Sequence, residues 1–591
     1  MISALCKYYQ HQVENGHSDI PIPGHTYLRI THVFEISKHG KLVRVLPLGE
    51  NGQRSLVPWT LEAACRKSNI AAYLLVDKTK YSLGFEGDTL TPEPGRAFRS
   101  IVSDLGVQTQ DEGILALHRF LQDWTPRTAL SWDEKEAIAS GTIAFKLQGD
   151  SCLVHERPAF RKYWVHNWLN WGGDQHKVTA KCLVTGCEQH IARIHQPIKE
   201  VKDSQTTGTA LVSFNKAAFS SYGKEQSYNA PISEEAAFAY TTALNHLLHK
   251  ENGHSVQIGD ATTVFWTDRP GAKAALHTLI TSEAVKDAPG KEGLLPNKDE
   301  KIAQAVRERL KAFRNGQPQL PSHDDRALFD TQCYILGLQA NKARLAVRFW
   351  HRGSLGELVH TVGRHYRAIA MERQHESQPI LPSLRQLLCA AAGIQVRRSP
   401  HSKEFDTVPP ILSGALVRSI LTGTPYPKSL FSIVLSRIRT DKQVTYLRAA
   451  TLKGCLLRNH PETAKDLPIS IDETRRDAPY LLGRLFAILE KTQQDALGFD
   501  PGGAFRDRCF NAASTTPSRV FPELLRRSRQ HVKIAEFGNA HAKKIRDLSQ
   551  TIDIFPPHLT LPEQGVFSIG YYHQKNVYHS TRKQEMSHGY H

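Results

Sequence analysis

A change of residue pattern near position 380 limits the folds that are open to this chain. Before it, apolar and polar residues alternate in short, strand-like runs; after it, apolar residues recur every three or four positions, the period of a packed helix. Short breakers such as TGTP at 422–425 separate the helical runs, among them SLFSIVLSRIRTD, VTYLRAATLKGCLL and PYLLGRLFAILEKTQQDAL. Short connections between amphipathic helices are typical of bundles. We therefore predict an all-α helical bundle over residues 381–591.

Residues 1–380 carry a mixed pattern. Strand-like alternation runs from Tyr27 to Leu48 around the turn Lys38-His39-Gly40, and a second pair of runs flanks Gln339–Lys342. Short strands are also expected at Ala210–Phe214 and around Gln148-Gly149, and Ser233-Glu234-Glu235 has the pattern of a helix start. The fold class predicted is α+β, with antiparallel sheets in a large N-terminal region that forms either one unit or two subdomains split near 230–300.

Charge gives the first indication of function. The 591 residues contain 75 Lys and Arg against 58 Asp and Glu, a net charge of +17, and residues 395–591 alone carry 29 against 18. Such a surplus attracts polyanions, and nucleic acid is favoured over an anionic membrane surface because no concentrated polybasic anchor is present. There is no run of about 18 apolar residues and no secretory leader pattern, and nine scattered cysteines favour reduced thiols. A cytoplasmic location is expected.

The stretch from Gln205 to Tyr222 is the strongest candidate for contact with nucleic acid. It combines short polar side chains, a glycine and a lysine, and it contains no carboxylate that would repel an anion. A second candidate is the apolar run 70–76, read as a strand core with cations and amides at both ends, and a third is Gln148, placed at a turn where its side chain could act as a wedge. The residues predicted to contact the bases and phosphates of nucleic acid are Lys67, Asn69, Lys78, Lys80, Gln148, Gln205, Thr206, Asn215, Lys216 and Tyr222.

Cations also repeat along the helices of the predicted bundle. One face of each helix is expected to pack, while the other follows a sugar–phosphate backbone; the competing interpretation is an ordinary solvated face. The residues predicted to contact such a backbone are Arg418, Arg437, Arg439, Arg448, Arg526, Arg527 and Arg529.

Two short patterns suggest metal chemistry. Cys182 to His195 (CLVTGCEQHIARIH) contains two cysteines and two histidines, but the spacing does not fit a closed zinc finger and the alternation predicts a hairpin with a buried cysteine. The isolated His323-Asp324-Asp325 lacks a second ligand cluster, and no phosphate loop, nucleophile elbow or metalloprotease motif occurs. We predict no catalytic residue, no metal and no cofactor; a metal-dependent nuclease is the alternative.

Several longer segments resemble one known family. QTTGTALVSFNKAAFSSYG, LVHERPAFRKYW, ARIHQPIKEV, ARLAVRFW, LTGTPYP, NAASTTPSRVFP and GVFSIGYYHQKN are similar to the large subunit of the type I-C CRISPR Cascade surveillance complex, the Csd1-type family. The similarity spans nearly the whole chain. One departure is Cys187, which stands where a carboxylate is expected.

The resemblance implies a non-catalytic subunit that works beside a crRNA, backbone subunits, a crRNA-processing subunit and a small subunit. Its N-terminal region, 1–380, would read the protospacer-adjacent motif (PAM) in duplex DNA and open it, forming an R-loop. Its bundle, 381–591, would hold the displaced non-target strand and contact other subunits before a helicase–nuclease is recruited. In the family a small subunit is translated from inside the same gene; here it would begin near Pro479, without a methionine between Met371 and Met586. A purely structural ribonucleoprotein scaffold remains a further alternative.

Overall fold

The computed structural model describes residues 1–17, 19–49, 52–64, 70–126, 135–171, 178–258, 260–269, 272–281, 298–317, 326–394, 410–498 and 505–588. Contacts within the chain divide it into two compact units. The first comprises Met1–Asn252 with Ala340–Ala346, and the second comprises Gly253–Gln339 with Val347–His591. No helix of the described residues is both long and apolar enough to cross a membrane.

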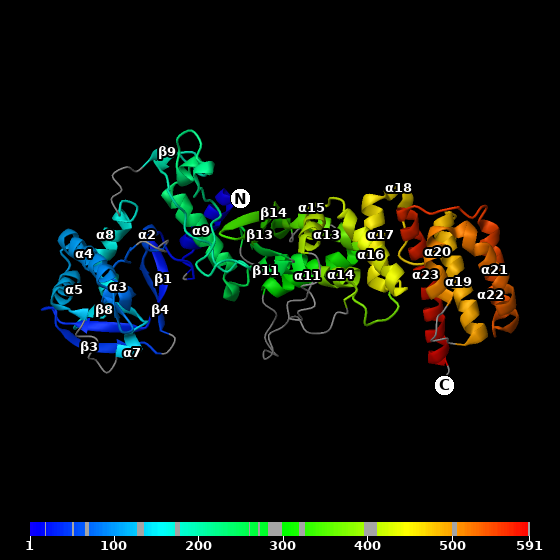
Figure 1. Cartoon of the computed structure of the whole chain (residues 1–591), viewed down its shortest axis with the longest axis horizontal. Coiled ribbons are helices and arrows are strands. Elements are labelled where there is room, and N and C mark those ends of the chain that lie inside the picture. The colour runs from blue at the N-terminus through cyan, green and yellow to red at the C-terminus, as the bar shows by residue number, and fades with distance from the viewer. Residues whose placement is uncertain are drawn as a thin grey trace. The chain divides into compact units, whose positions relative to one another are not determined.

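The first unit mixes short strands with helices (Figure 1). Its described elements are α1 (Ile2–Glu14), β1 (His25–Ile30), β2 (His32–Ile36), β3 (Leu42–Pro47), β4 (Gln53–Pro58), α2 (Leu61–Ala64), β5 (Asp77–Lys78), α3 (Thr79–Ser82), β6 (Phe85–Glu86), β7 (Thr89–Leu90), α4 (Pro92–Thr109), α5 (Glu112–Asp123), α7 (Lys135–Ile138), β8 (Thr142–Leu147), η1 (Val154–Glu156), α8 (Pro158–Asn167), β9 (Thr179–Lys181), β10 (Glu188–His190), η2 (Ala217–Phe219), η3 (Gln226–Asn229), α9 (Glu234–Leu248) and η4 (Lys250–Asn252).

A four-stranded mixed sheet of order β3-β2-β8-β5 carries the larger core of this unit. Strands β2 and β8 pair in parallel, with Phe34 opposite Phe145, whereas β3 and β5 pair antiparallel with their neighbours. Helices α4 and α5 supply Phe98 and Phe120, whose rings lie 6.0–6.4 Å from those two sheet residues. The Asp111 carboxylate starts α5 by accepting hydrogen bonds from the first free N–H groups of the helix. The helices are thereby fixed over one face of the sheet.

Helix α9 organises the remainder of the first unit. As predicted, it begins at Ser233, whose hydroxyl accepts a hydrogen bond from the Ala236 N–H. Most of its residues are buried, and α1 packs along it, with the Tyr8 hydroxyl 3.2 Å from the His246 ring. A helix packed in this way can hold the side chains of an adjacent site in fixed positions.

The second unit begins with a four-stranded sheet of order β11-β12-β13-β14 and continues as helices. Its described elements are β11 (Ser255–Ile258), β12 (Ala261–Thr267), α10 (Lys273–Thr281), α11 (Lys298–Arg314), α12 (Arg326–Phe329), β13 (Gln332–Asn341), β14 (Arg344–Ser354), α13 (Leu355–Ala368), α14 (Leu384–Ala392), α15 (Pro410–Thr422), α16 (Lys428–Asp441), α17 (Tyr446–Asn459), α18 (Pro461–Ala464), α19 (Ala478–Leu497), α20 (Phe505–Thr515), α21 (Pro517–Ile534), α22 (Gly538–Thr551) and α23 (Leu561–His588).

Helices α19 and α23 form the tightest helix pair of the bundle (Figure 1). A Cβ atom on Gly483 would lie 2.0 Å from the Phe567 carbonyl oxygen, and one on Gly570 would lie 2.2 Å from that of Tyr480. Glycine is therefore required at both positions, because any side chain would force the two backbones apart. Two buried polar pairs lie inside this contact: the Tyr571 hydroxyl donates to Glu490 at 2.6 Å, and the Tyr480 hydroxyl lies 2.9 Å from His573 Nδ1.

The predicted α+β class is confirmed, as is the hairpin around Gly40. Three strand predictions are wrong. Residues 70–76 contain no strand, and Leu75 has a φ of 63°, which interrupts extended backbone. Residues 210–214 make only an isolated bridge, and after Gly149 the chain turns toward η1 instead of forming a second strand.

The predicted domains, 1–380 and 381–591, are defined by their expected roles in reading duplex DNA and in holding the displaced strand, and this division remains a prediction. The division by contacts falls at Asn252, inside the interval 230–300 where a subdomain split was one alternative. In the second unit, one continuous apolar core runs from Phe265 in β12 to Tyr572 in α23. The sheet and the bundle of this unit therefore share a core across residue 380.

Candidate nucleic-acid interface

An exposed stretch from Asn215 to Glu225 is the most accessible of the predicted DNA contacts. Each of its residues is exposed, and no carboxylate occurs before Glu225. Asn215, Lys216 and Tyr222 lie together on this stretch, whereas Gln205 and Thr206 lie on the exposed turn before it, closed by the Gly208 N–H donating to the Gln205 carbonyl. Five of the ten residues predicted to contact the duplex therefore lie at exposed positions within one segment, residues 205–222.

Arg344 anchors this stretch from a distant part of the sequence. Its guanidinium donates to Asn215 Oδ1 at 2.7 Å and lies 4.2 Å from the centre of the Phe219 ring. The backbone adds two bonds: the Ala210 N–H donates to the Ala343 carbonyl, and the Leu345 N–H donates to the Ala210 carbonyl. Because the acceptor oxygen of Asn215 is occupied, its amide N–H groups remain to donate to a base edge or a phosphate.

Tyr222 stands at the tip of the stretch. Its side chain is 98% exposed and its φ is 51°, while the Lys224 N–H donates to the Ser221 carbonyl and closes the turn. An exposed aromatic ring between Lys216 and Lys224 suits stacking on a base with phosphates held alongside. The geometry can therefore serve nucleic acid, and it contributes little to the core.

The other predicted duplex contacts are not gathered with Tyr222. Lys78 pairs opposite Thr142 at the start of β8, and Gln148 follows its end, so the length of that strand places the two roughly 20 Å apart. Both side chains are exposed, whereas Lys80 is engaged by Glu86 in an ion pair of 3.0 Å. Lys67 and Asn69 lie outside the described residues. Lys78 and Gln148 consequently cannot contact the same base pair.

The arginines predicted on the bundle fall into two groups. Arg448 is buried at 6% exposure; it pairs with Asp441 and donates to the carbonyls of Ala390 and Gln443 at 3.1 and 3.0 Å. We therefore assign Arg448 to the core of the bundle and not to a DNA surface. Arg437, also paired with Asp441 at 2.7 Å, and Arg439, bonded to Gln564, are half-buried.

The exposed group consists of Arg418, Arg526, Arg527 and Arg529. Arg526 and Arg527 share Glu523, with nitrogen–oxygen distances of 2.8 and 2.6 Å, and these hydrogen bonds lower the pKa of Glu523 below its ordinary value. Within the described part of the chain, Arg418 and Arg529 have no side-chain partner of this kind. Of these four arginines, Arg418 and Arg529 therefore present a whole unit of charge to solvent.

The candidate metal segment folds as the predicted hairpin of β9 and β10, with Cys182 buried and Cys187 exposed. Burial would raise the pKa of the Cys182 thiol, but hydrogen bonds from Ser233 and Thr185 outweigh it and lower that pKa to about 7. Among the residues that the structure describes, no group of three or more His, Cys, Asp or Glu side chains is placed to hold a metal ion. His323-Asp324-Asp325 lies outside those residues.

Comparison with models of protein families identifies the family of this chain. The family model for the CRISPR-associated protein Cas_Csd1 matches residues 5–579. The chain belongs to the Cas_Csd1 family. No functionally curated protein matches the chain. The match confirms the family that the sequence motifs indicated and makes this a CRISPR-associated protein.

Membership of the Cas_Csd1 family covers both the exposed stretch and the bundle, since the match reaches from α1 into α23. Sequence reasoning missed Arg344, because it lies 129 residues from Asn215 and sits in a run that only suggested a strand. No local signal marks such a partner. The burial of Arg448 was missed for a related reason, since Asp441 and Ala390 reach it from neighbouring helices.

Proposed function

We propose that this Cas_Csd1 protein is the large subunit of a type I-C CRISPR Cascade complex, and that it reads a short PAM in duplex DNA, opens the duplex and holds the displaced strand. Family membership supports a Cascade context. The observation that carries the DNA-reading role is the exposed stretch 215–224, which has no carboxylate and is fixed to Arg344. A surface of this kind is accessible, attractive to anions and anchored through the contacts of Asn215 and Phe219 with Arg344.

On this proposal the exposed stretch divides its work between base and backbone. Asn215, held through its oxygen by Arg344, donates its amide N–H groups to a base edge, while Lys216 and Lys224 neutralise phosphates. Tyr222 stacks on a base as the duplex opens. Each specific base contact discriminates by about 1–3 kcal/mol, whereas each phosphate contact acts equally on all sequences.

The bundle holds the displaced non-target strand through its exposed arginines, chiefly Arg418 and Arg529. Backbone contacts of this kind release counterions and depend steeply on salt. The partners we propose are the crRNA, the backbone, crRNA-processing and small subunits, and a recruited helicase–nuclease. The protein itself is proposed to be non-catalytic and to act in the cytoplasm.

The test is a gel-shift panel with the assembled complex on duplexes that differ only in the PAM. Asn215→Ala should narrow the difference between the best and worst motifs, while Lys216→Ala should weaken binding to all of them by a similar factor. Equal losses on every motif for Asn215→Ala would remove the base-reading assignment.

Two further assays separate the alternatives. Crosslinking to each strand of an opened target distinguishes a DNA-binding subunit from a scaffold, which should not reach the non-target strand. Incubation of the purified protein with DNA and divalent metals distinguishes a nuclease, since metal-dependent cutting would contradict the non-catalytic proposal.

A further inference from the structure

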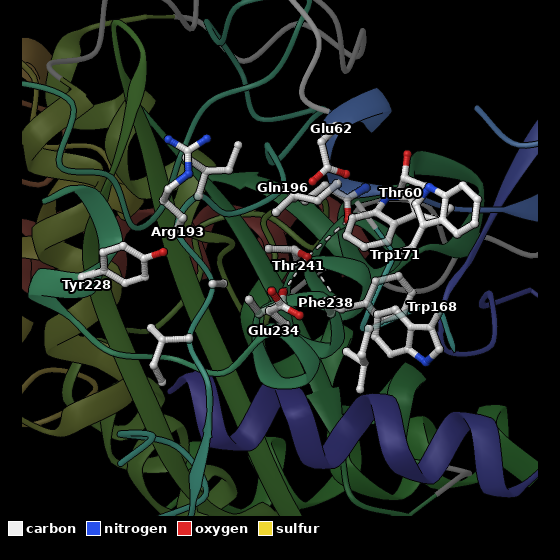
Figure 2. A pocket seen from close by; sticks show the side chains of 17 residues that line it. Thr60, Glu62, Trp168, Trp171, Arg193, Gln196, Tyr228, Glu234, Phe238 and Thr241 are labelled. Atoms are coloured by element: carbon white, nitrogen blue, oxygen red, sulfur yellow. Dashed lines mark hydrogen bonds between the residues drawn. The ribbon is translucent and has the colours of Figure 1, made fainter. Parts of the chain in front are cut away.

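An aromatic pocket opens in the first unit (Figure 2). Two of its lining residues, Arg193 and Tyr228, adjoin the C-terminal end of the exposed stretch, where Arg193 donates to the Gln226 side chain. It holds a cavity of about 90 Å³ between α2, the residues that follow α8, the segment after β10 and the first turns of α9. All of its lining residues belong to one compact unit, so its shape does not depend on how the units are placed. The cavity is several times larger than a water molecule needs.

Indole and phenyl rings make one side of this pocket. Trp59, Trp168 and Phe238 form a mutual cluster, with ring centres 4.9 Å apart for Trp59–Phe238 and 5.4 Å apart for Trp168–Phe238. Trp171 adds a further indole, and Figure 2 shows Trp168, Trp171 and Phe238 grouped on one side while Arg193 and Tyr228 lie on the other. Rings held by their neighbours provide a preformed flat surface.

The polar groups of the pocket are of mixed kind and include two carboxylates, those of Glu62 and Glu234. The indole N–H of Trp59, a residue only 7% exposed, is buried and has no hydrogen-bond partner among the described residues. Gln196 accepts from the Thr241 hydroxyl at 3.3 Å, which leaves its amide N–H groups available. Glu62 brings an exposed carboxylate to the lining and Arg193 an exposed guanidinium. A buried donor without a partner costs free energy, which an acceptor on a ligand would recover.

We propose that this pocket binds one unpaired nucleobase that carries an exocyclic amino group. The base stacks against the indoles, its ring nitrogen or carbonyl accepts from Trp59 or Gln196, and its amino group donates to the Glu62 carboxylate. Arg193, on the far side from the indoles in Figure 2, takes the attached phosphate. Thymine and uracil are disfavoured because their one donor, the N3–H, is flanked by two carbonyl oxygens that a carboxylate repels.

The charges and donors of the pocket favour a base over other occupants. A free phosphate inside the cavity would meet the Glu62 carboxylate, and a lysine or arginine side chain from a protein partner would leave the Trp59 N–H without an acceptor. A nucleobase carries acceptors and donors on one flat edge and satisfies both. The ligand class rests on the proposed nucleic-acid function, whereas none of the residues that line the pocket lies within the stretch 215–225.

The test uses the full-length protein and short single-stranded DNA homopolymers of dA, dC, dG and dT, followed by calorimetry and by quenching of tryptophan fluorescence. We expect dA, dC or dG to bind more tightly than dT. Glu62→Gln should remove that preference by weakening the preferred homopolymer at least roughly tenfold, because a hydrogen bond to a charged acceptor is lost. Glu235→Gln is the matched control, since Glu235 adjoins the lining residue Glu234 on α9 but does not line the pocket.

Trp59→Phe provides a second variant, because it keeps an aromatic wall and removes only the N–H donor. It should weaken base binding while the protein keeps its fold by circular dichroism. Equal affinity for all four homopolymers in the native protein, or no change in either variant, would overturn the proposal. Tighter, Glu62-dependent binding of acetyl-arginine amide would also overturn it and would make the pocket a protein-docking site.

Gel shifts with PAM-containing duplex, run on the same variants, keep this inference distinct from the proposed function. If a pocket variant loses the homopolymer preference but binds the duplex as the native protein does, the result supports the pocket and leaves the proposed PAM-reading role unaffected. Homopolymer binding without any duplex shift would instead contradict the proposed PAM-reading role.

Discussion

The exposed stretch of the first unit and helices α16 and α17 of the second unit each carry more basic than acidic residues, but the fold places their cations differently. Along 215–225 every residue faces solvent, and Tyr222 is 98% exposed. In α17, by contrast, Arg448 and Lys453 are 6% and 2% exposed, and both donate to backbone carbonyls. The comparison teaches that charge in a helical bundle cannot be equated with charge available to DNA.

Elsewhere in the bundle, buried cations act in the same structural way. Arg475 donates to the carbonyls of Ala464 and Lys465. Burial lowers the pKa of Lys453 to about 7, and the nearby charges of Arg314 and Arg367 lower it in the same direction. The surplus of 11 cations in residues 395–591 therefore overstates the charge that reaches a ligand.

The largest effect should come from Arg448→Ala. Removing the guanidinium leaves the Ala390 and Gln443 carbonyls without their donor and Asp441 with Arg437 as its remaining arginine, which should lower the free energy of unfolding by about 2–4 kcal/mol. Urea denaturation followed by circular dichroism measures it. Arg418→Ala, at an exposed position, is the control and should stay within about 0.5 kcal/mol. If both variants were equally stable, the division into structural and available arginines would fail.

The pH dependence of stability provides a second test of the ion pairs that Asp441 makes with Arg448 and Arg437. Burial alone would raise the pKa of Asp441, but hydrogen bonds from Arg448 and Arg437 outweigh it, so the pKa falls below its ordinary 3.8. A carboxylate with a lowered folded pKa stabilises the protein fully above 3.8, and this contribution is lost as the pH falls through the folded value. The stability difference between native protein and Asp441→Asn should therefore be constant near neutral pH and shrink below 3.8. A difference that did not change with pH would contradict the ion-pair assignment.

Tyr222→Ala should produce the next largest effect, on binding and not on stability. Loss of one stacking contact should weaken binding to an opened target by about 1–3 kcal/mol, roughly 5- to 150-fold. The melting temperature should not change, because the side chain is 98% exposed. Fluorescence anisotropy on a partly unwound duplex measures the affinity, and Tyr222→Phe should keep it. A loss in both variants would point to the hydroxyl instead of the ring.

A smaller, sequence-independent effect is expected for Arg529→Ala. It should reduce the slope of log affinity against log salt by about one, with the same loss on every target sequence. Arg448→Ala, measured where it remains folded, should leave that slope unchanged. If the native protein, Arg529→Ala and Arg448→Ala had similar salt slopes, the bundle would not hold the strand through Arg529.

The smallest effect should follow Glu523→Gln. Glu523 is shared by Arg526 and Arg527, so its neutralisation releases two guanidinium groups toward a phosphate backbone. Binding should strengthen slightly at low salt and converge with the native protein at high salt, because exposed charges are screened. Weaker binding would mean that Glu523 positions these arginines.

Much of the fold could be predicted from local pattern. The periodicity after residue 380, the helix start at Ser233 and the hairpin around Gly40 are each set by residues close in sequence, and all appear in the structure. Prediction failed where local pattern and backbone disagree: Ala210–Phe214 has apolar alternation, but only an isolated bridge with Arg344 forms there. In the candidate site, the exposed cluster of Asn215, Lys216 and Tyr222 was foreseen and the anchoring Arg344 was not.

The sequence by itself determined the α+β class, the helical bundle, the excess of positive charge and the family, because periodicity, composition and motifs are properties of neighbouring residues. Only the tertiary structure decided which cations remain in water, which side chain fixes Asn215, and that Trp59, Glu62, Trp168 and Gln196 line one pocket. The reason is physical: burial and hydrogen-bond partners depend on which distant segments pack together, and no local pattern contains that information.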